Sequence, residues 1–305
     1  MSQYLGEFAA LAGSLMYTAS STLFSQASRR VGSMALNRLR LLLAIGWLLL
    51  AHALLRTPLP LRLDSGRLFW LSLSGIIGLV IGDLFLFQSY IYIGPRLTML
   101  MMALAPAIAA LAAWLITGET LQPLEIAGIA LTLAGIGWVI SDRTRPRAGA
   151  QGSAAPTSRR AYLLGLLCGL GAAAGQALGL VTARLGLGGG FPAVSVTLLC
   201  RAAAAAALWS ISLFGGQAAE TVRTLRAQPR ALWLALGGSF FGPFAGVTLS
   251  LYAIQHTEVG VASTLNSLSP IFLLPVGYFL LKERFGWQSV AGTLLAMAGV
   301  ALLFL

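Results

Sequence analysis

Long apolar runs, each close to the roughly 20 residues that a helix needs to cross a membrane, follow one another along this chain. Hydrophobic residues make up 57% of it and charged residues 10%, and the mean hydropathy is +0.83. This apolar content is higher than a soluble globular domain needs to form its core. The pattern predicts an all-α integral membrane protein with ten transmembrane helices. The predicted spans cover residues 6–27, 35–55, 68–90, 97–117, 123–141, 162–184, 192–214, 231–253, 260–281 and 287–305.

A shift of 164 residues, without a gap, superposes one half of the chain on the other. The phrase that runs from Pro106 to Glu119 recurs from Pro270 to Glu283, with almost no charge inside either copy. Four pairs of glycines coincide under the same shift, namely Gly78 with Gly242, Gly82 with Gly246, Gly128 with Gly292 and Gly135 with Gly299. Matches of this kind indicate an internal repeat.

The repeat predicts two five-helix halves, residues 1–141 and 162–305, joined by a polar linker over 142–161 that is rich in Pro, Gly, Ser and Arg. Because five spans bring the chain out on the opposite side of the membrane, the second half is expected to be inverted relative to the first. Inverted repeats that enclose a central cavity are typical of secondary transporters. In the first helix of each half the shift that aligns the two copies is a few residues smaller than 164, so that Tyr17 is equivalent to Gln176.

Pro106 and Pro270 each lie inside a predicted span, where proline removes a backbone donor. They predict matched kinks in the fourth and ninth helices. Such kinks are either gates for alternating access or purely structural. Glu119 and Glu283 lie where these helices end, and we expect their carboxylates to accept hydrogen bonds from the start of the following helix.

Asp83 is the one acidic residue deep inside an apolar run. A carboxylate there costs about 3 kcal/mol unless it is paired or lines water. It is therefore a candidate coupling group that accepts a proton, or one member of a buried ion pair with Arg38, Arg40 or Arg201. Its equivalent in the second half is Val247, so its role is not duplicated. We take Asp83, Arg40 and Arg201 as candidates for a coupling site or a buried charge cluster.

Polar and aromatic side chains recur inside the spans. Gln88 is equivalent to Tyr252, as Tyr17 is to Gln176, which places four polar tips at symmetric positions. Together, amides and phenols can orient a small zwitterion while the rings stack on it. The alternative is that each group only bonds a neighbouring helix. The candidate substrate-binding residues are Tyr17, Gln88, Tyr90, Gln176, Tyr252 and Asn266.

The sequence carries no signature of catalysis, of a metal site or of a cofactor. His52 and His256 are the only histidines, and neither a nucleophile motif nor a phosphate-binding glycine loop occurs. Cys168 and Cys200 both fall in apolar spans, where we expect them to serve packing. We therefore expect a protein that is not an enzyme and that binds neither metal nor cofactor.

The formal net charge is +11. In a soluble protein this charge indicates nucleic acid, but here most arginines lie between spans, where they anchor helices to lipid headgroups, so we expect no nucleic acid partner. Thirteen Lys and Arg residues, Arg96 among them, follow odd-numbered spans, against four on the other side. The positive-inside rule then places the first set in the cytoplasm and both termini in the periplasm.

The segment GDLFLFQSYIYIGPRLTMLMMALAPAIAALAAWLITGETL, residues 82–121, resembles the EamA-type transporters of the drug/metabolite transporter superfamily. In both halves the proline–glutamate phrase is followed by glycines nine and sixteen residues later. The resemblance covers essentially the whole chain and extends in general character to the bacterial exporters of aromatic amino acids. It implies a proton- or gradient-linked carrier of small metabolites in a bacterial inner membrane. No residue is carried over as a substrate signature.

The leading hypothesis is a secondary transporter that exports small metabolites by alternating access, amino acids above all and aromatic ones among them. Its expected partners are a small-molecule substrate and the bilayer, and one chain is expected to work as a monomer because it holds both halves. Two alternatives stay open. One is a proton-coupled multidrug or cation antiporter built on Asp83, and the other is a membrane scaffold with no cargo and a dry interface between its halves.

Overall fold

The computed structural model describes residues 4–55, 64–118, 120–143, 158–186, 193–257, 259–280 and 286–304. Regular structure within these ranges is entirely helical, which confirms the predicted all-α fold. Seven helical segments are long and apolar enough to cross a membrane, and two shorter apolar helices follow Leu104 and Gly286. The count of ten spans stays a prediction.

The first half begins with two long helices, after which the third helix changes its winding midway. Its elements are α1 (Leu5–Val31), α2 (Ser33–Leu55), α3 (Ser65–Ser74), the π-helix η2 (Gly75–Gly82), α4 (Asp83–Met102), α5 (Ala105–Thr117) and α6 (Pro123–Arg143). Gly94 interrupts α4 with φ of 79°, a left-handed conformation that glycine adopts readily, and Pro95 starts the next stretch.

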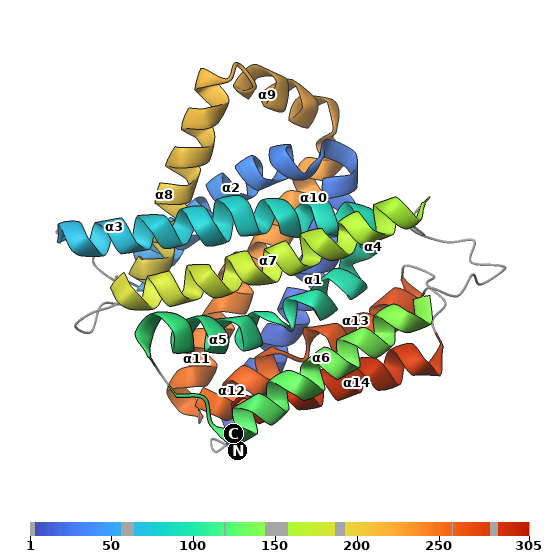
Figure 1. Cartoon of the computed structure of the whole chain (residues 1–305). Coiled ribbons are helices and arrows are strands. Elements are labelled where there is room, and N and C mark those ends of the chain that lie inside the picture. The colour runs from blue at the N-terminus through green and yellow to red at the C-terminus, as the bar shows by residue number, and fades with distance from the viewer. Residues whose placement is uncertain are drawn as a thin grey trace.

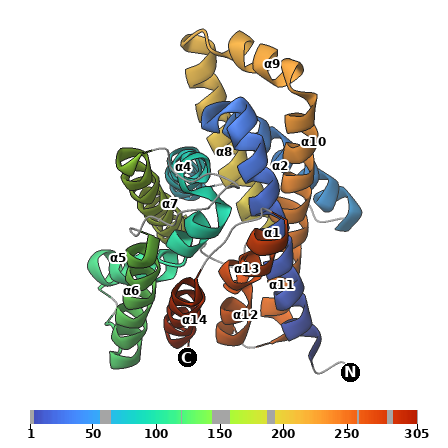
Figure 2. The same cartoon turned by 90° about the vertical axis from the view of Figure 1, so that its right-hand side faces the viewer.

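The second half repeats this order with two differences: it has an additional short surface helix, α9, and two helices, α11 and α12, where the first half has the interrupted α4. Its elements are α7 (Arg159–Gly186), α8 (Ala193–Phe214), α9 (Ala218–Ala227), α10 (Pro229–Ser239), the π-helix η3 (Phe240–Gly246), α11 (Val247–His256), α12 (Val259–Asn266), α13 (Ser269–Phe279) and α14 (Trp287–Leu302). Figure 1 shows α9 at the end of an arch that α8 and α10 form, and Figure 2 shows the same arch from the side.

Two helix breaks lie next to the paired prolines. Pro106 is in the first turn of α5, just after the turn at Ala103 and Leu104, and Pro270 is in the first turn of α13. A proline in a first helical turn has no intrahelical bond to lose, so each break costs little. A gating role for these breaks stays a prediction. Glu119 and Glu283 lie outside the described residues.

The two π-helices occupy equivalent places in the two halves, because a shift of 164 residues carries η2 onto η3. They contain two of the glycine pairs of the repeat. A π-helical turn is wider than an α-helical one, and such turns often mark functional sites. Nothing in the hydrophobic pattern predicts them.

The halves exchange their first helices. α1 packs on α10, η3 and α11 of the second half, whereas α7 packs on α3, η2 and α4 of the first. Figure 1 shows α7 running alongside α3 and α4, and Figure 2 shows α1 beside α10 and α11. Neither half therefore buries its own core alone.

The last helices of the two halves pack on each other through glycines. A Cβ at Gly128 would lie 2.8 Å from the carbonyl oxygen of Gly299, and one at Gly292 would lie 2.9 Å from that of Gly135. Residue numbers rise along α6 while those of the contacting residues fall along α14, so the two helices are antiparallel. Equivalent helices that run antiparallel are what an inverted repeat requires.

Candidate functional site

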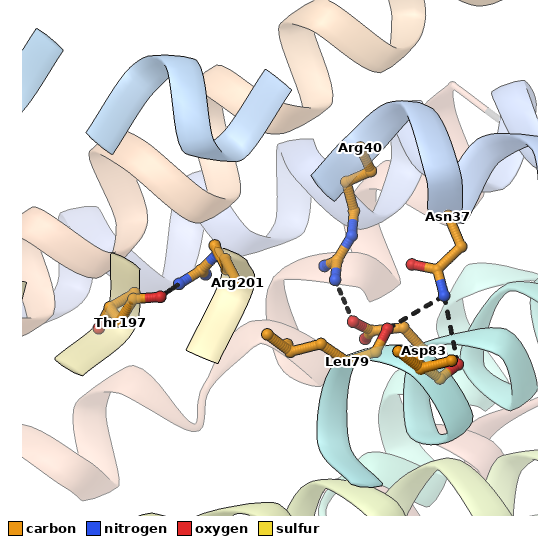
Figure 3. A network of polar contacts seen from close by, with 7 residues as sticks. Asn37, Arg40, Leu79, Asp83, Thr197 and Arg201 are labelled. Atoms are coloured by element: carbon orange, nitrogen blue, oxygen red, sulfur yellow. Dashed lines mark hydrogen bonds and ion pairs between the residues drawn. The ribbon is translucent and has the colours of Figure 1, made fainter. Parts of the chain in front are cut away.

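A buried ion pair joins α2 to the start of α4. Asp83 is the first residue of α4, directly after η2, and its carboxylate accepts a hydrogen bond from Nη2 of Arg40. Both side chains are buried. Of the three arginines considered from the sequence, Arg40 is thus the one that pairs with Asp83, as Figure 3 shows.

Aromatic rings hold Arg40 in place. Its guanidinium carbon lies 5.4 Å from the ring centroid of Phe87 and 6.0 Å from that of Phe24. A cation over a ring face is stabilised by the ring quadrupole, and more so away from water. The rings come from α1 and α4, so this cation ties three helices together.

Asn37, one turn before Arg40, binds α2 to η2. Its side-chain amide donates to the carbonyl oxygens of Leu79 at 3.0 Å and Val80 at 3.2 Å. Residues three positions apart share a face of a helix, so this anchor also turns Arg40 toward Asp83. Figure 3 shows both side chains reaching from α2 toward the end of η2.

Arg201 on α8 is the second buried cation of this region. α8 approaches η2 closely because Gly75 has no side chain, and a Cβ there would collide with the carbonyl of Cys200. Arg201 is 8% exposed. Its Nη1 donates only a long bond, 3.5 Å, to the carbonyl of Thr197 on its own helix, toward which it turns in Figure 3. The charges of Asp83 and Arg40 both act on it.

A chain of polar side chains joins α1 to α11 and α12. The hydroxyl of Tyr17 lies 3.3 Å from Oγ of Ser250, which donates to Oδ1 of Asn266 at 3.0 Å. Glycines make room for it. A Cβ at Gly13 would lie 2.8 Å from Oδ1 of Asn266, and one at Gly246 would lie 2.9 Å from the ring of Tyr17. The positive charge of Arg201 also acts on the phenol of Tyr17.

Three other predicted substrate-binding residues lie elsewhere. The side-chain carbonyl of Gln88 accepts a bond of 2.8 Å from Oγ of Ser33. Tyr90 is buried in the core, and Tyr252 is 39% exposed, with its ring stacked on that of His256 at 4.0 Å between centroids. Among the described residues, no hydrogen bond or ring contact joins any two of the four symmetric side chains predicted from the repeat.

Gln176 lines a different feature, a half-open pocket of about 250 Å³ between α5, α7 and the C-terminal end. The amide is exposed there among apolar side chains, and Pro106 forms part of the same wall. The lining residues are Ala105, Pro106, Ala109, Ala110, Gln176, Ala177, Leu180, Leu303 and Phe304. Both halves line this pocket, and Tyr17 is not among its lining residues, so the two equivalent positions have different surroundings.

Two further arginines are buried for structural reasons. Arg38 donates to the side chains of Thr221 and Gln217, which fixes α9 to α2. Arg96 is 3% exposed and donates to Oγ of Ser289 at 2.7 Å. The prediction that Arg96 lies in a loop between spans is wrong. α4 resumes directly after the break at Gly94 and buries this side chain.

The cysteines Cys168 and Cys200 are free thiols, and Sγ of Cys200 lies 3.8 Å from Oγ of Ser74. Within the described part of the chain, no group of three or more His, Cys, Asp and Glu side chains is placed to hold a metal ion. Two residues of the site, Ser250 and Asn37, were missed from the sequence. A single serine or asparagine in an apolar helix carries no spacing signal that would single it out.

Comparison with family models identifies the family of this chain. The model of the EamA-like transporter family matches residues 4–141 and 163–305. A probable 4-amino-4-deoxy-L-arabinose-phosphoundecaprenol flippase subunit ArnE from Pseudomonas fluorescens is 31% identical over 95 residues, which are 31% of this chain and 78% of that protein. A crystal structure of a protein superposes with a TM-score of 0.52 at 22% identity, covering 96% of this chain and 94% of that one, and so shares the fold.

Proposed function

The chain belongs to the EamA-like transporter family and is a multi-pass membrane transporter, and on that premise we propose that it exports small metabolites across a bacterial inner membrane. Amino acids, aromatic ones among them, are the leading substrates. The termini are proposed to face the periplasm, on the basis of the arginine-rich loops. No cofactor enters this scheme.

The observation that carries the proposal is a buried polar region with charges of both signs between the two halves. An amino acid has a carboxylate and an ammonium group. Arg201 is available to the carboxylate, and Asp83, although paired with Arg40, supplies negative charge in the same region. Oδ1 of Asn266 and the hydroxyl of Tyr17 add hydrogen-bonding partners on the α1 side. The rings of Phe24 and Phe87 beside Arg40 supply aromatic surface.

The proposed movement is alternating access between the interlocked halves. The breaks before α5 and α13, and the wide turns of η2 and η3, are points where a helix bends without losing a full set of bonds. They occur in matched pairs, so each half has the same hinges. Rocking about such hinges exposes a central region to one side at a time.

The cation-antiporter alternative is less well supported. This region holds two buried arginines, Arg40 and Arg201, and one buried carboxylate, and a surplus of positive charge opposes the entry of a cation. Under that alternative, Asp83→Asn abolishes drug resistance in cells while amino acids fail to move. Under our proposal the same variant mainly releases Arg40 and weakens folding.

A second candidate function is the movement of a lipid that carries a phosphate group. It is favoured by the apolar pocket beside Gln176, which suits an acyl or isoprenoid chain, and by the likeness to a protein named as a probable flippase subunit for a phosphoundecaprenol-linked sugar. That protein corresponds in length to one half of this chain, since 95 residues are 78% of it.

Counterflow in proteoliposomes tests the proposal. Vesicles are loaded with one unlabelled amino acid at a time, aromatic ones first, and entry of the same labelled compound is followed. We expect transient accumulation for at least one amino acid. Equal entry into vesicles with and without the protein, for every amino acid, overturns the amino acid proposal and leaves the lipid candidate, which a fluorescent phospholipid-flipping assay then examines.

A further inference from the structure

We propose that Arg201 is the substrate-binding cation of this carrier and that it holds an oxyanion of the substrate, a carboxylate or a phosphate. The inference rests on the proposed transport function, because it names the chemical class of what is transported. It starts from the way in which the buried arginines are paired.

Four arginines are buried in the described part of the chain, and three of them have close side-chain partners. Arg40 pairs with Asp83, Arg38 binds Thr221 and Gln217, and Arg96 binds Ser289. Each of these contacts joins two elements of the fold. Each arginine therefore has a structural task.

Arg201 differs from the other three. Within the described residues its one hydrogen bond is 3.5 Å long and goes to the carbonyl of Thr197 on the same helix, so it joins no two elements. Its Nε is buried without a partner in the described part of the chain, as are those of Arg38 and Arg40, but these two arginines bind other side chains through Nη1 or Nη2 whereas Arg201 does not. A guanidinium has five N–H donors and stays charged, and burying such a group without a counter-charge is costly. A buried guanidinium with unused N–H donors has the chemistry that an anion-binding site requires.

The surroundings of Arg201 fit binding that is reversible. Asp83 attracts Arg201 but is already bonded to Arg40, so it compensates the second cation only in part. The phenol of Tyr17 is near enough to interact with Arg201, and its 3.3 Å contact with Ser250 is weak enough to exchange. An incoming oxyanion would take the free donors of Arg201 and the Tyr17 hydroxyl. Repulsion from Asp83 would then help it to leave.

The test measures binding to the purified full chain in detergent by thermal shift, independently of transport. Three probes share one ring: L-phenylalanine, phenethylamine, which has no carboxylate, and phenyl phosphate. We expect the two probes that carry an oxyanion, L-phenylalanine and phenyl phosphate, to raise the melting temperature in a dose-dependent way and phenethylamine to have at least about tenfold lower affinity. Preference for phenyl phosphate indicates a phosphate-bearing substrate, and preference for phenylalanine indicates an amino acid. Both preferences support the oxyanion site.

Variants locate the site. Arg201→Gln is expected to lower affinity for the tighter-binding of the two oxyanion-bearing probes about 50- to 100-fold. Arg201→Lys should lower it about 10-fold, because the charge remains while the planar fork is lost. Arg38→Gln removes an equally buried arginine outside the site, and we expect it to keep affinity within about twofold. Without ligand, Arg201→Gln should melt no lower than wild type, since it removes a poorly compensated buried charge.

Three results overturn the inference: phenethylamine binding as tightly as phenylalanine, unchanged affinity in Arg201→Gln, or stabilisation that sodium chloride reproduces at equal concentration. The inference and the proposed function fail separately. Anion binding that depends on Arg201 without any counterflow contradicts the carrier and keeps the site, whereas counterflow that survives Arg201→Gln keeps the carrier and removes the site.

Discussion

The crossing of α1 over η3 and the crossing of α7 over η2 are equivalent in the repeat, and they use the same hydrogen bond in opposite directions. At one crossing Oγ of Ser74 donates to the carbonyl of Gly179 at 2.6 Å, and at the other Oγ of Ser20 donates to that of Gly238 at 2.8 Å. Ser74 and Gly238 are equivalent, 164 residues apart, and so are Ser20 and Gly179 in the shifted register of the first helices. The geometry is kept while donor and acceptor trade places.

Their chemistry differs otherwise. Gly175 and Gly179 of α7 bring backbone against the backbone of η2, with room for little else. On α1 the positions that face η3 hold Tyr17 and Ser20. The same backbone arrangement therefore gives a tight glycine contact between α7 and η2, which we call the seam, and a polar contact between α1 and η3. The duplicated fold keeps its symmetry in packing and loses it at the polar crossing, where we propose that the substrate binds.

The largest expected effect is at the seam. A Cβ at Gly175 would lie 2.6 Å from Cα of Gly82, so Gly175→Leu forces α7 off η2. We expect a loss of at least about 3 kcal/mol in unfolding free energy, read as a fall in melting temperature or as aggregation on size-exclusion chromatography. Gly137→Leu, at a position with open space around it, is the control and should behave like wild type. Similar behaviour of the two variants contradicts the seam.

The next effect is on transport at the polar crossing. Tyr17→Phe removes only a hydroxyl whose contact with Ser250 is 3.3 Å, so stability should change by less than about 1 kcal/mol. Counterflow of the transported compound should fall about 10-fold in kcat/KM, equivalent to about 1.4 kcal/mol. The matched control is Tyr4→Phe, an exposed tyrosine outside the site. Unchanged transport in Tyr17→Phe would remove the phenol from the binding region.

A smaller effect tests the shared bond. Ser20→Ala removes the side-chain bond to the Gly238 carbonyl, and Ser74→Ala removes the one between helices to the Gly179 carbonyl, which also accepts from Thr182. We expect each change to cost about 1 kcal/mol in unfolding free energy. If the crossings are equivalent, the two losses agree within about 0.5 kcal/mol, a difference that paired thermal melts resolve. Losses that differ by more than this would show that the two hydrogen bonds contribute unequally to the free energy of unfolding.

The smallest effect is expected for Gln176→Leu. The amide is exposed in an apolar pocket and has no hydrogen-bond partner among the described residues. We expect stability to change by less than about 0.5 kcal/mol, as for most surface substitutions, and amino acid counterflow to stay within about twofold. A loss like that of Tyr17→Phe would show that both crossings contact the substrate. In a lipid-flipping assay the same variant reports directly on the pocket.

The fold could largely be predicted from the sequence because apolar length and the 164-residue repeat are long-range signals that single substitutions do not erase. The site could be predicted only in part. Gln88 and Tyr252 are equivalent in sequence, yet the exchange of first helices gives α4 and α11 different neighbours, so the two side chains have different partners. Asp83 stood out because one carboxylate in an apolar run is costly, but its choice of Arg40 depends on the anchor at Asn37, which no spacing reveals.

The exchange of first helices also governs the order in which the protein can be assembled during synthesis. More than 200 residues separate the end of α1 from the end of α11, its packing partner. At roughly 5–20 residues per second, α1 waits about 10 to 45 s in the membrane before that partner emerges.

This wait is hazardous for a helix so rich in hydroxyl groups, because lipid offers them no partners. Most hydroxyl groups of α1 are satisfied within the helix, because each donates to a carbonyl three or four residues earlier. They belong to Ser14, Thr18, Ser21, Thr22 and Ser28. The nascent helix thus satisfies most of its own polar groups while it waits. Tyr17, whose hydroxyl faces Ser250, and Ser20, which donates to Gly238, are among the hydroxyl residues without such a bond, and these two side chains later define its crossing with η3.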